Sequence, residues 1–204
     1  MVRALLDGSK TQTRRVVKPW AVSDLTHKPV PADLEYLPDF TCYRSTCPYG
    51  QPGDRLWVRE TWRGVVNIAP PGSYEYAVAR YIPDREYCRR VEYAASQELD
   101  GEPWRPSIHM PRWASRITLE ITEVRVERLQ AISEADSIAE GIEHDQDISR
   151  GNIIGWRDYL NRGGKCGTAN GSYRSLWESI NGPDSWSANP WVWAVSFKRL
   201  ENPA

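Results

Sequence analysis

The sequence has no long apolar run and few cysteines, and each shortage excludes a class of protein. No run approaches the ~20 apolar residues that a membrane-spanning helix needs, so we expect no membrane partner. The first eight residues interrupt a short apolar stretch with Asp7, which is not typical of a signal peptide. Four cysteines in 204 residues do not make a disulfide framework. These shortages predict a cytoplasmic protein.

Motifs for metals and cofactors are also scarce. The three histidines are scattered, and there is no Gly-rich phosphate loop, no Gly-x-Ser-x-Gly motif and no His-Glu-x-x-His motif. Cys42 and Cys47 lie at the loose end of zinc-ligand spacing, and a four-ligand site would also need Cys88 and His109. No second close pair of ligands exists, so we expect neither a metal nor a cofactor.

Net charge, lysine and phenylalanine are scarce as well. The 26 basic and 27 acidic residues leave a net charge of −1, which gives no global attraction to nucleic acid or membrane. Only five basic residues are lysine, and the other 21 are arginine, whose planar fork recognises phosphates, carboxylates and base edges. Two phenylalanines stand against ten tryptophans and ten tyrosines, which suit cores, interfaces and base stacking. The composition therefore predicts a local anion or base site.

What is present is a series of short β-strands with helices between them. Strands are predicted over 55–62, 74–81, 115–129 and 191–200, and a shift in the alternation of 115–129 indicates a β-bulge. Helices are predicted over 2–6, 133–141, 153–160 and 173–180. The second of these begins with the capping pattern Ser133-x-x-Asp136 and ends at Gly141. The order predicts an α+β fold, a small β-barrel decorated with helices, in one domain over 1–204 with insertions at about 19–50 and 82–112.

Lys10 and Thr13 are the first candidates for catalysis, in the basic segment KTQTRR. They are three residues apart, so a helical or turn conformation puts them on the same side. A lysine amine whose pKa is lowered by burial acts as a general base toward a threonine hydroxyl. The neighbouring Arg14 and Arg15 suit the binding of a phosphate or an oxyanion. A solvated basic turn has the same composition, and the residues alone leave both interpretations open.

Three ordered blocks add to this segment: Gly8-x-Lys10-x-x-Thr13-x-Arg15, Gly53-Asp54-x-Leu56-x-Val58 and the terminal WVWAVSFKRL. Together they resemble the ASCH domain family of the PUA-like superfamily. Further blocks resemble its longer phage and prophage members, so that the similarity spans nearly the whole chain. The resemblance implies a PUA-like small β-barrel that carries a site for a nucleoside or a nucleic acid.

The resemblance also implies an activity, because some small ASCH proteins are amidohydrolases that deacylate N4-acetylcytidine with a Lys, a Thr and a Glu. These residues fall on Lys10, Thr13 and Glu140. Thr13 would attack the amide carbonyl and Lys10 would take its hydroxyl proton. Glu140 would orient Lys10 or protonate the leaving amine, and Arg15 would stabilise the oxyanion.

The expected partner is a nucleoside or a short single-stranded nucleic acid. The residues predicted to bind it are Arg14, Arg15, Trp57 and Trp62, the two tryptophans by stacking on a base or else by filling the core. Two alternatives use the same basic segment without deacylation: a non-catalytic module for RNA or modified bases, and a ribonuclease. The net charge of −1 argues against tight non-specific binding of long nucleic acids.

Overall fold

A computed structural model describes residues 2–17, 47–66, 85–86, 88–97, 103–147, 153–162 and 165–201. The chain divides into two compact units. The first unit consists mainly of Arg3–Arg55 and Glu120–Arg199, and the second mainly of Leu56–Leu119. The strand predicted over 74–81 and nearly all of the insertion predicted at 19–50 lie outside the described residues.

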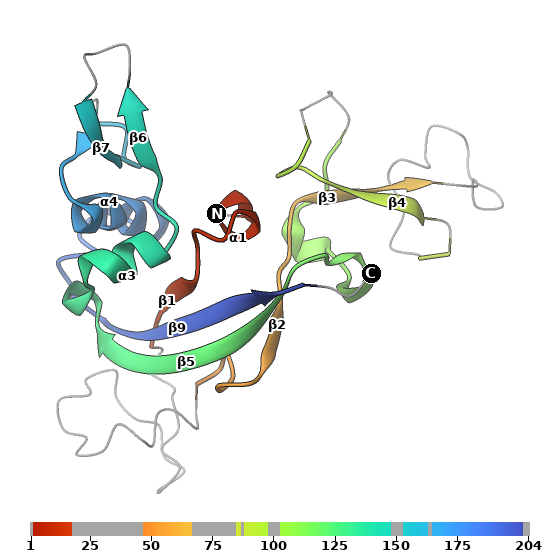
Figure 1. Ribbon diagram of the computed structural model, residues 1–204, viewed down its shortest axis with the longest axis horizontal. Helices are drawn as coiled ribbons and strands as arrows, with labels where there is room; N and C mark the ends of the chain where they lie inside the picture. The colour runs from red at the N-terminus through yellow and green to blue at the C-terminus, as the bar shows by residue number, and fades with distance from the viewer. Residues whose placement is uncertain are drawn as a thin grey trace, which may run out of the picture. The chain divides into compact units, whose positions relative to one another are not determined.

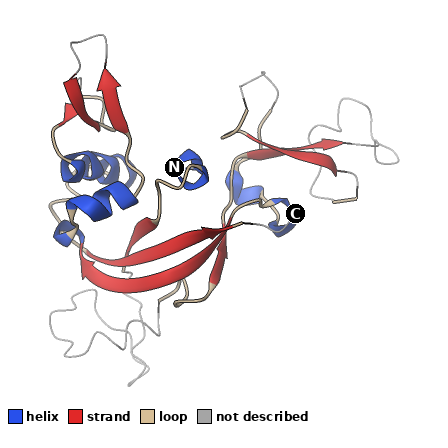
Figure 2. Cartoon of the chain, viewed as in Figure 1, coloured by secondary structure: helices blue, strands red, loops and turns tan. Residues whose placement is uncertain are grey.

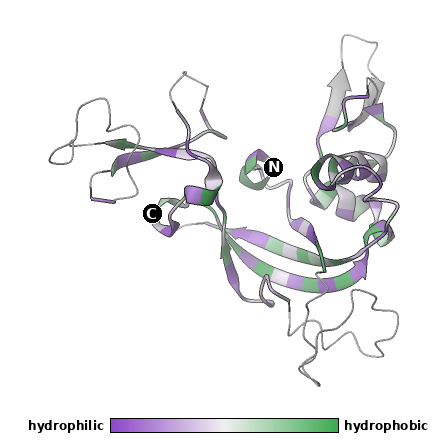
Figure 3. Ribbon diagram, turned by 180° about the vertical axis from the view of Figure 1, so that it is seen from behind, coloured by the Kyte–Doolittle hydropathy of each residue, from purple (hydrophilic) through white to green (hydrophobic). Residues whose placement is uncertain are grey.

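A four-stranded sheet has the order β1–β9–β5–β2, and its strands are β1 (Gln12–Val16), β9 (Trp191–Leu200), β5 (Thr118–Arg128) and β2 (Arg55–Trp57). The long strands β9 and β5 lie side by side and curve together (Figure 1). Hydrophobic and hydrophilic residues alternate along β5 (Figure 3), which is the pattern of a pleated strand whose two faces differ. In β9, the four residues Val192–Val195 are all buried, so both faces of that stretch are covered. The predicted mixed fold with a curled antiparallel sheet is confirmed at this level.

Strand β5 carries the predicted shift in alternation. Lys198 lies two residues from Ser196 on β9, so both point to one face, the face on which Ser196 accepts a hydrogen bond from Gln12. Glu120 pairs with Lys198 at 2.8 Å, and Glu127 pairs with Arg14, two residues beyond Gln12. Residues 120 and 127 are an odd number apart, yet both contact this face. One extra residue between them therefore shifts the pleat, as a β-bulge does.

Two smaller sheets complete the strands. The first pairs β3 (Trp62–Val66) with β4 (Cys88–Tyr93), and the second has the order β6–β7–β8, with β6 (His144–Asp147), β7 (Ile153–Arg157) and β8 (Lys165–Cys166). The strand predicted over 55–62 is broken, because β2 ends at Trp57 and β3 begins at Trp62. The helix predicted over 153–160 is wrong. The short apolar run in this segment fits the periodicity of a helix and that of a strand, and its β-branched and aromatic residues favour the strand that forms, β7.

The helices are α1 (Val2–Leu6), α3 (Glu134–Ala139) and α4 (Ala169–Asn181), and the last two lie beside each other in Figure 2. Short 3-10 turns cover Ser107–His109, Arg112–Ala114 and Leu129–Ala131. The capping prediction for α3 is confirmed, since the Ser133 hydroxyl accepts a hydrogen bond from the Asp136 amide at 3.0 Å. Helix α4 begins earlier than predicted, because the Thr168 hydroxyl caps it by accepting from the Gly171 amide.

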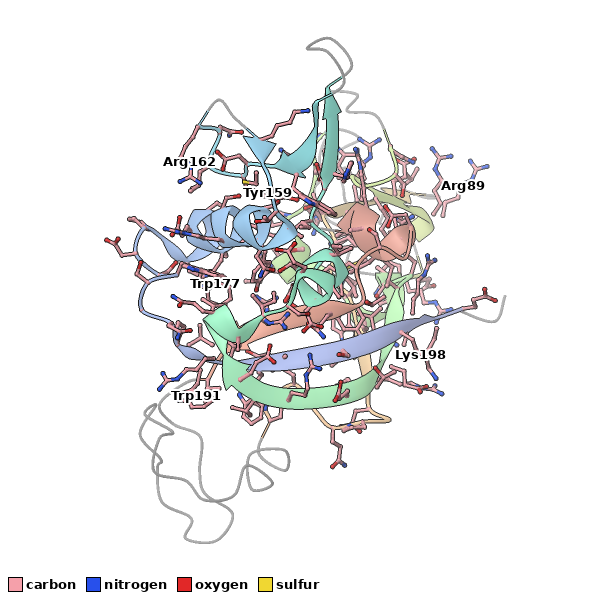
Figure 4. The ribbon with its side chains drawn as sticks, turned by 60° about the vertical axis from the view of Figure 1, so that its left-hand side comes forward. Arg89, Tyr159, Arg162, Trp177, Trp191 and Lys198 are labelled. Atoms are coloured by element: carbon pink, nitrogen blue, oxygen red, sulfur yellow. The ribbon has the colours of Figure 1, made fainter. Side chains whose placement is uncertain are left out.

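The core of the first unit lies between α4 and the sheet. Tyr173, Leu176 and Trp177 of α4 pack in one cluster with Leu129 and Val192, and all five side chains are buried. Figure 4 shows Trp177 between the helix and the strands. Burial of a leucine-sized side chain stabilises a fold by about 1.5–3 kcal/mol. This cluster therefore fixes α4, and with it Tyr173, against the sheet.

Candidate functional site

Lys10 and Glu140 form a buried ion pair in the first unit. Lys10 Nζ lies 2.8 Å from Glu140 Oε2, and the two side chains are 7% and 3% exposed. The ammonium has three protons and three acceptors: the Gln12 carbonyl at 2.8 Å, the Glu140 carbonyl at 2.6 Å and Glu140 Oε2. The hydrogen-bonding capacity of the lysine is thus fully used within the protein.

The backbone brings these two residues together. Lys10 and Glu140 form an antiparallel β-bridge, and the Thr11 amide donates to the Ala139 carbonyl at 2.8 Å. Gly141 follows with a φ of +77°, and a Cβ on it would lie 2.7 Å from Lys10 Cβ. Glycine is required there both for the left-handed turn that ends α3 and for the close approach of Lys10. The ammonium also lies at the C-terminus of α3, where a cation is favourable.

Arg14 extends the buried pair into a larger charged cluster, whose outer members are partly exposed. Its guanidinium donates to Glu127 Oε1 from Nε at 2.9 Å and from Nη2 at 2.6 Å. It also lies 3.3 Å from Glu140 Oε1 and 3.4 Å from Asp136 Oδ2, and its side chain has no exposed surface. Arg125 lies 3.5 Å from Asp136. We call Lys10, Arg14, Arg125, Glu127, Asp136 and Glu140 the charged cluster, in which three cations balance three carboxylates.

Burial and charge shift the pKa values of two members of the cluster, Lys10 and Asp136, and of the neighbouring Tyr173. Burial lowers the pKa of Lys10, and the Glu140 carboxylate acts in the opposite direction without reversing the shift. Burial acts to raise the pKa of Asp136, but hydrogen bonding with Ser133 and the charge of Arg14 hold it below its usual value. Burial, followed by the charge of Glu140, raises the pKa of Tyr173, whose hydroxyl lies 3.5 Å from Glu140 Oε1. Tyr173 therefore stays protonated beside the carboxylate.

Thr13 and Arg15 lie on the opposite face of β1 from this cluster. Gln12 and Arg14 stand opposite Ser196 and Ala194 of β9, whereas Thr13 and Arg15 stand opposite Val195 and Trp193. The predicted contact of Lys10 with Thr13 assumed a helix or turn, but the segment is a strand, in which successive side chains point to opposite faces. Arg14, predicted to bind substrate, is buried among carboxylates. Arg15 is exposed.

The two tryptophans predicted to contact substrate lie in the second unit. Trp62 is 0% exposed and forms a core cluster with Met110 and Ala114, so it does not offer a free face to a base. Trp57 is half-buried at the end of β2. Of the two, only Trp57 keeps a surface that a ligand can reach.

Sequence reasoning missed five members of the polar network: Gln12, Arg125, Glu127, Asp136 and Tyr173. Asp136 was recognised only as part of the α3 cap, which it also is. The alternation of β1 was the available signal for Gln12, since a strand beginning there places it on the face of Arg14. No local pattern links Glu127 or Tyr173 to residue 10. Their positions depend on the long-range pairing of the sheet and on the packing of α4.

No family model matches the chain, and neither the curated proteins nor the solved structures include a significant match to it. In the part of the chain that the structure describes, no group of three His, Cys, Asp or Glu side chains is placed to hold a metal ion. Of the helices described, none has the length and apolar character needed to cross a membrane. The ASCH resemblance therefore rests on the sequence motifs alone.

Proposed function

We propose that the chain is an amidohydrolase that deacylates N4-acylated cytidine-type nucleosides, with Lys10 and Glu140 as its proton-transfer pair. The observation that carries the proposal is the buried contact of 2.8 Å between Lys10 Nζ and Glu140 Oε2. Two residues 130 positions apart, each expected to be catalytic from the motif resemblance, meet away from solvent. Buried ionisable pairs with a shifted pKa are common at active sites.

The proposed reaction needs one group that accepts a proton and one that donates a proton. A water molecule attacks the acyl carbon, and the Glu140 carboxylate takes a proton from it. The bond between the acyl carbon and N4 breaks, and Lys10 delivers a proton to the departing amine. Burial lowers the pKa of Lys10, which makes its ammonium a stronger acid than a lysine in water. The products are a carboxylic acid and the free cytosine nucleoside.

Two features of the structure constrain the reaction, one for the substrate and one for the nucleophile. The Lys10 ammonium has three acceptors in the protein, so the acyl amide has to replace one of them for proton transfer. Thr13 lies on the opposite face of β1, and for this reason the proposal assigns the attack to water. A Thr13→Val variant tests that assignment. Turnover stays near the wild-type rate if water attacks, and it is lost if the Thr13 hydroxyl is the nucleophile.

The central experiment measures release of cytidine from a panel of N4-acylated cytidines by chromatography. The double variant Lys10→Met/Glu140→Leu removes both proton-transfer groups and leaves the charge of the cluster balanced. We expect its rate to fall at least about a hundredfold, the usual contribution of general acid–base catalysis. The matched control is Lys198→Met/Glu120→Leu, which removes a surface ion pair between β9 and β5. Figure 4 shows Lys198 on β9. This control should keep the wild-type rate.

Two results would contradict the proposal. If the purified wild-type protein leaves the whole panel unchanged, the chain is not this hydrolase. If the Lys10→Met/Glu140→Leu variant turns over at the wild-type rate, the pair is only structural. The same preparation, incubated with a labelled RNA, separates the two alternatives: a ribonuclease shortens the RNA, and a binding module retains it intact.

A further inference from the structure

A half-buried tryptophan in the second unit holds two exposed arginines. Trp57 ends β2, Arg59 follows two residues later, and Arg112 begins a 3-10 turn. The guanidinium carbon of Arg59 lies 4.8 Å from the centroid of the Trp57 ring, and that of Arg112 lies 5.7 Å from it. Both distances are within the range of cation–π attraction. One aromatic ring thus gathers two positive charges that are about fifty residues apart in the sequence.

No carboxylate of the described residues neutralises these two arginines. Within the described ranges, neither Arg59 nor Arg112 forms an ion pair, and Arg59 donates only a long hydrogen bond, of 3.4 Å, to the Ile108 carbonyl. In the same unit, Arg63 and Arg116 each contact a buried glutamate, Glu92 and Glu60 respectively, at 2.7 and 2.8 Å. The guanidiniums held by Trp57 therefore keep most of their donors for an external anion.

We propose that Trp57, Arg59 and Arg112 form a second binding site, which takes the phosphodiester backbone of a single-stranded nucleic acid. A guanidinium presents a planar fork that matches two oxygens of a phosphate. Two such forks on one ring suit a ligand with repeated phosphates. Nucleic-acid bases stack on aromatic rings and on guanidinium planes. Ile108, whose carbonyl accepts the Arg59 hydrogen bond, is 68% exposed and adds apolar surface next to the site.

The role of Trp57 in this site is to organise the two arginines before the ligand binds. A free arginine side chain loses rotamer freedom when it grips a phosphate, and contact with the ring removes part of that cost in advance. Trp57 itself carries no charge. It should therefore set the affinity without contributing to the dependence of binding on salt, whereas each arginine should contribute to both.

The test measures binding of a labelled oligouridylate of about ten nucleotides, a length typical for single-strand sites, as a function of salt. Each phosphate contact on a single strand contributes about −0.7 to the slope of log K against log salt, so each tenfold fall in salt strengthens it about fivefold. We expect Arg59→Gln and Arg112→Gln each to lower the slope by about 0.7. Trp57→Leu should weaken binding and leave the slope unchanged.

The control is Arg174→Gln, which removes a half-exposed arginine already paired with Glu178 on α4. It should leave both the affinity and the slope unchanged. Absence of oligouridylate binding, or slopes of Arg59→Gln and Arg112→Gln equal to wild type, would overturn the proposal. Equal binding of a polyglutamate of the same length would also overturn it, because the site would then select charge and not phosphodiesters. The site does not depend on the proposed deacylation, and either activity can fail alone.

Discussion

Replacing Lys10 alone should destabilise the protein more than replacing Lys10 and Glu140 together. In Lys10→Met, the Glu140 carboxylate stays buried and loses its contact of 2.8 Å, and among the described residues it keeps Arg14 at 3.3 Å and the long Tyr173 hydrogen bond. In Glu140→Leu, the Lys10 ammonium keeps two carbonyl acceptors and loses its counter-charge. Breaking a buried pair in this way costs about 3–5 kcal/mol.

The double variant should be far milder, because it removes one charge of each sign. Arg14 still has Glu127 and Asp136, so no unpaired charge remains in the cluster. Replacement of a buried ion pair by apolar side chains of similar volume is often neutral or stabilising. We therefore expect Lys10→Met/Glu140→Leu to unfold within about 2 kcal/mol of wild type. Because each single variant loses at least about 3 kcal/mol and the double variant at most about 2 kcal/mol, the coupling energy between the two residues is about 4 kcal/mol or more.

The assay is urea unfolding of wild type, both single variants and the double variant, followed by circular dichroism. The surface pair Lys198–Glu120, which is 58% and 26% exposed, provides the matched cycle, and its coupling should not exceed about 1 kcal/mol. If the two buried substitutions simply add, the ion pair is not coupled in the way its geometry requires. That outcome would also weaken the case for shared proton chemistry.

Two further predictions concern the surroundings of the pair. The Ser133 hydrogen bond and the charge of Arg14 hold the pKa of Asp136 below 3.8 in the folded protein. Asp136 therefore contributes stability above pH 3.8, and this contribution is lost as the pH falls through the lower folded pKa. Asp136→Asn should flatten that part of a curve of unfolding free energy against pH, and an unchanged curve would refute the assignment. Gly141→Ala adds a Cβ 2.7 Å from Lys10 Cβ at a φ of +77°, whereas Gly8→Ala meets the same backbone restriction at +81° with nothing within 4 Å. Gly141→Ala should therefore cost more than the roughly 1–2 kcal/mol of left-handed strain expected for Gly8→Ala, and equal losses in urea unfolding would show that the contact with Lys10 carries no weight.

The elements that the sequence predicted correctly have strong local signals. The terminal strand WVWAVSFKRL is rich in β-branched and aromatic residues, and β9 covers the predicted range from Trp191 to Leu200. Ser133 and Gly141 bracket α3 as a cap and a stop, through their own hydrogen-bonding and backbone preferences. The segment from Ile153 to Leu160 had no comparable signal. A short apolar run fits a strand and a helix equally well, and pairing with β6 decided the outcome.

The position of Thr13 shows where sequence reasoning about the site reached its limit. The spacing of three between Lys10 and Thr13 predicts a common face only if the backbone turns there, and the antiparallel pairing of β1 with β9 extends it instead. In a strand the grouping is by twos, so Gln12 and Arg14 join Lys10 and Glu140 in one hydrogen-bonded network while Thr13 and Arg15 face the other way. The motif groups Lys10 with Thr13, but the two side chains thus lie on opposite faces of a strand. A variant on one face reports on that face alone, and for this reason Thr13→Val and the Lys10→Met/Glu140→Leu variant give independent answers about which residues act on the substrate.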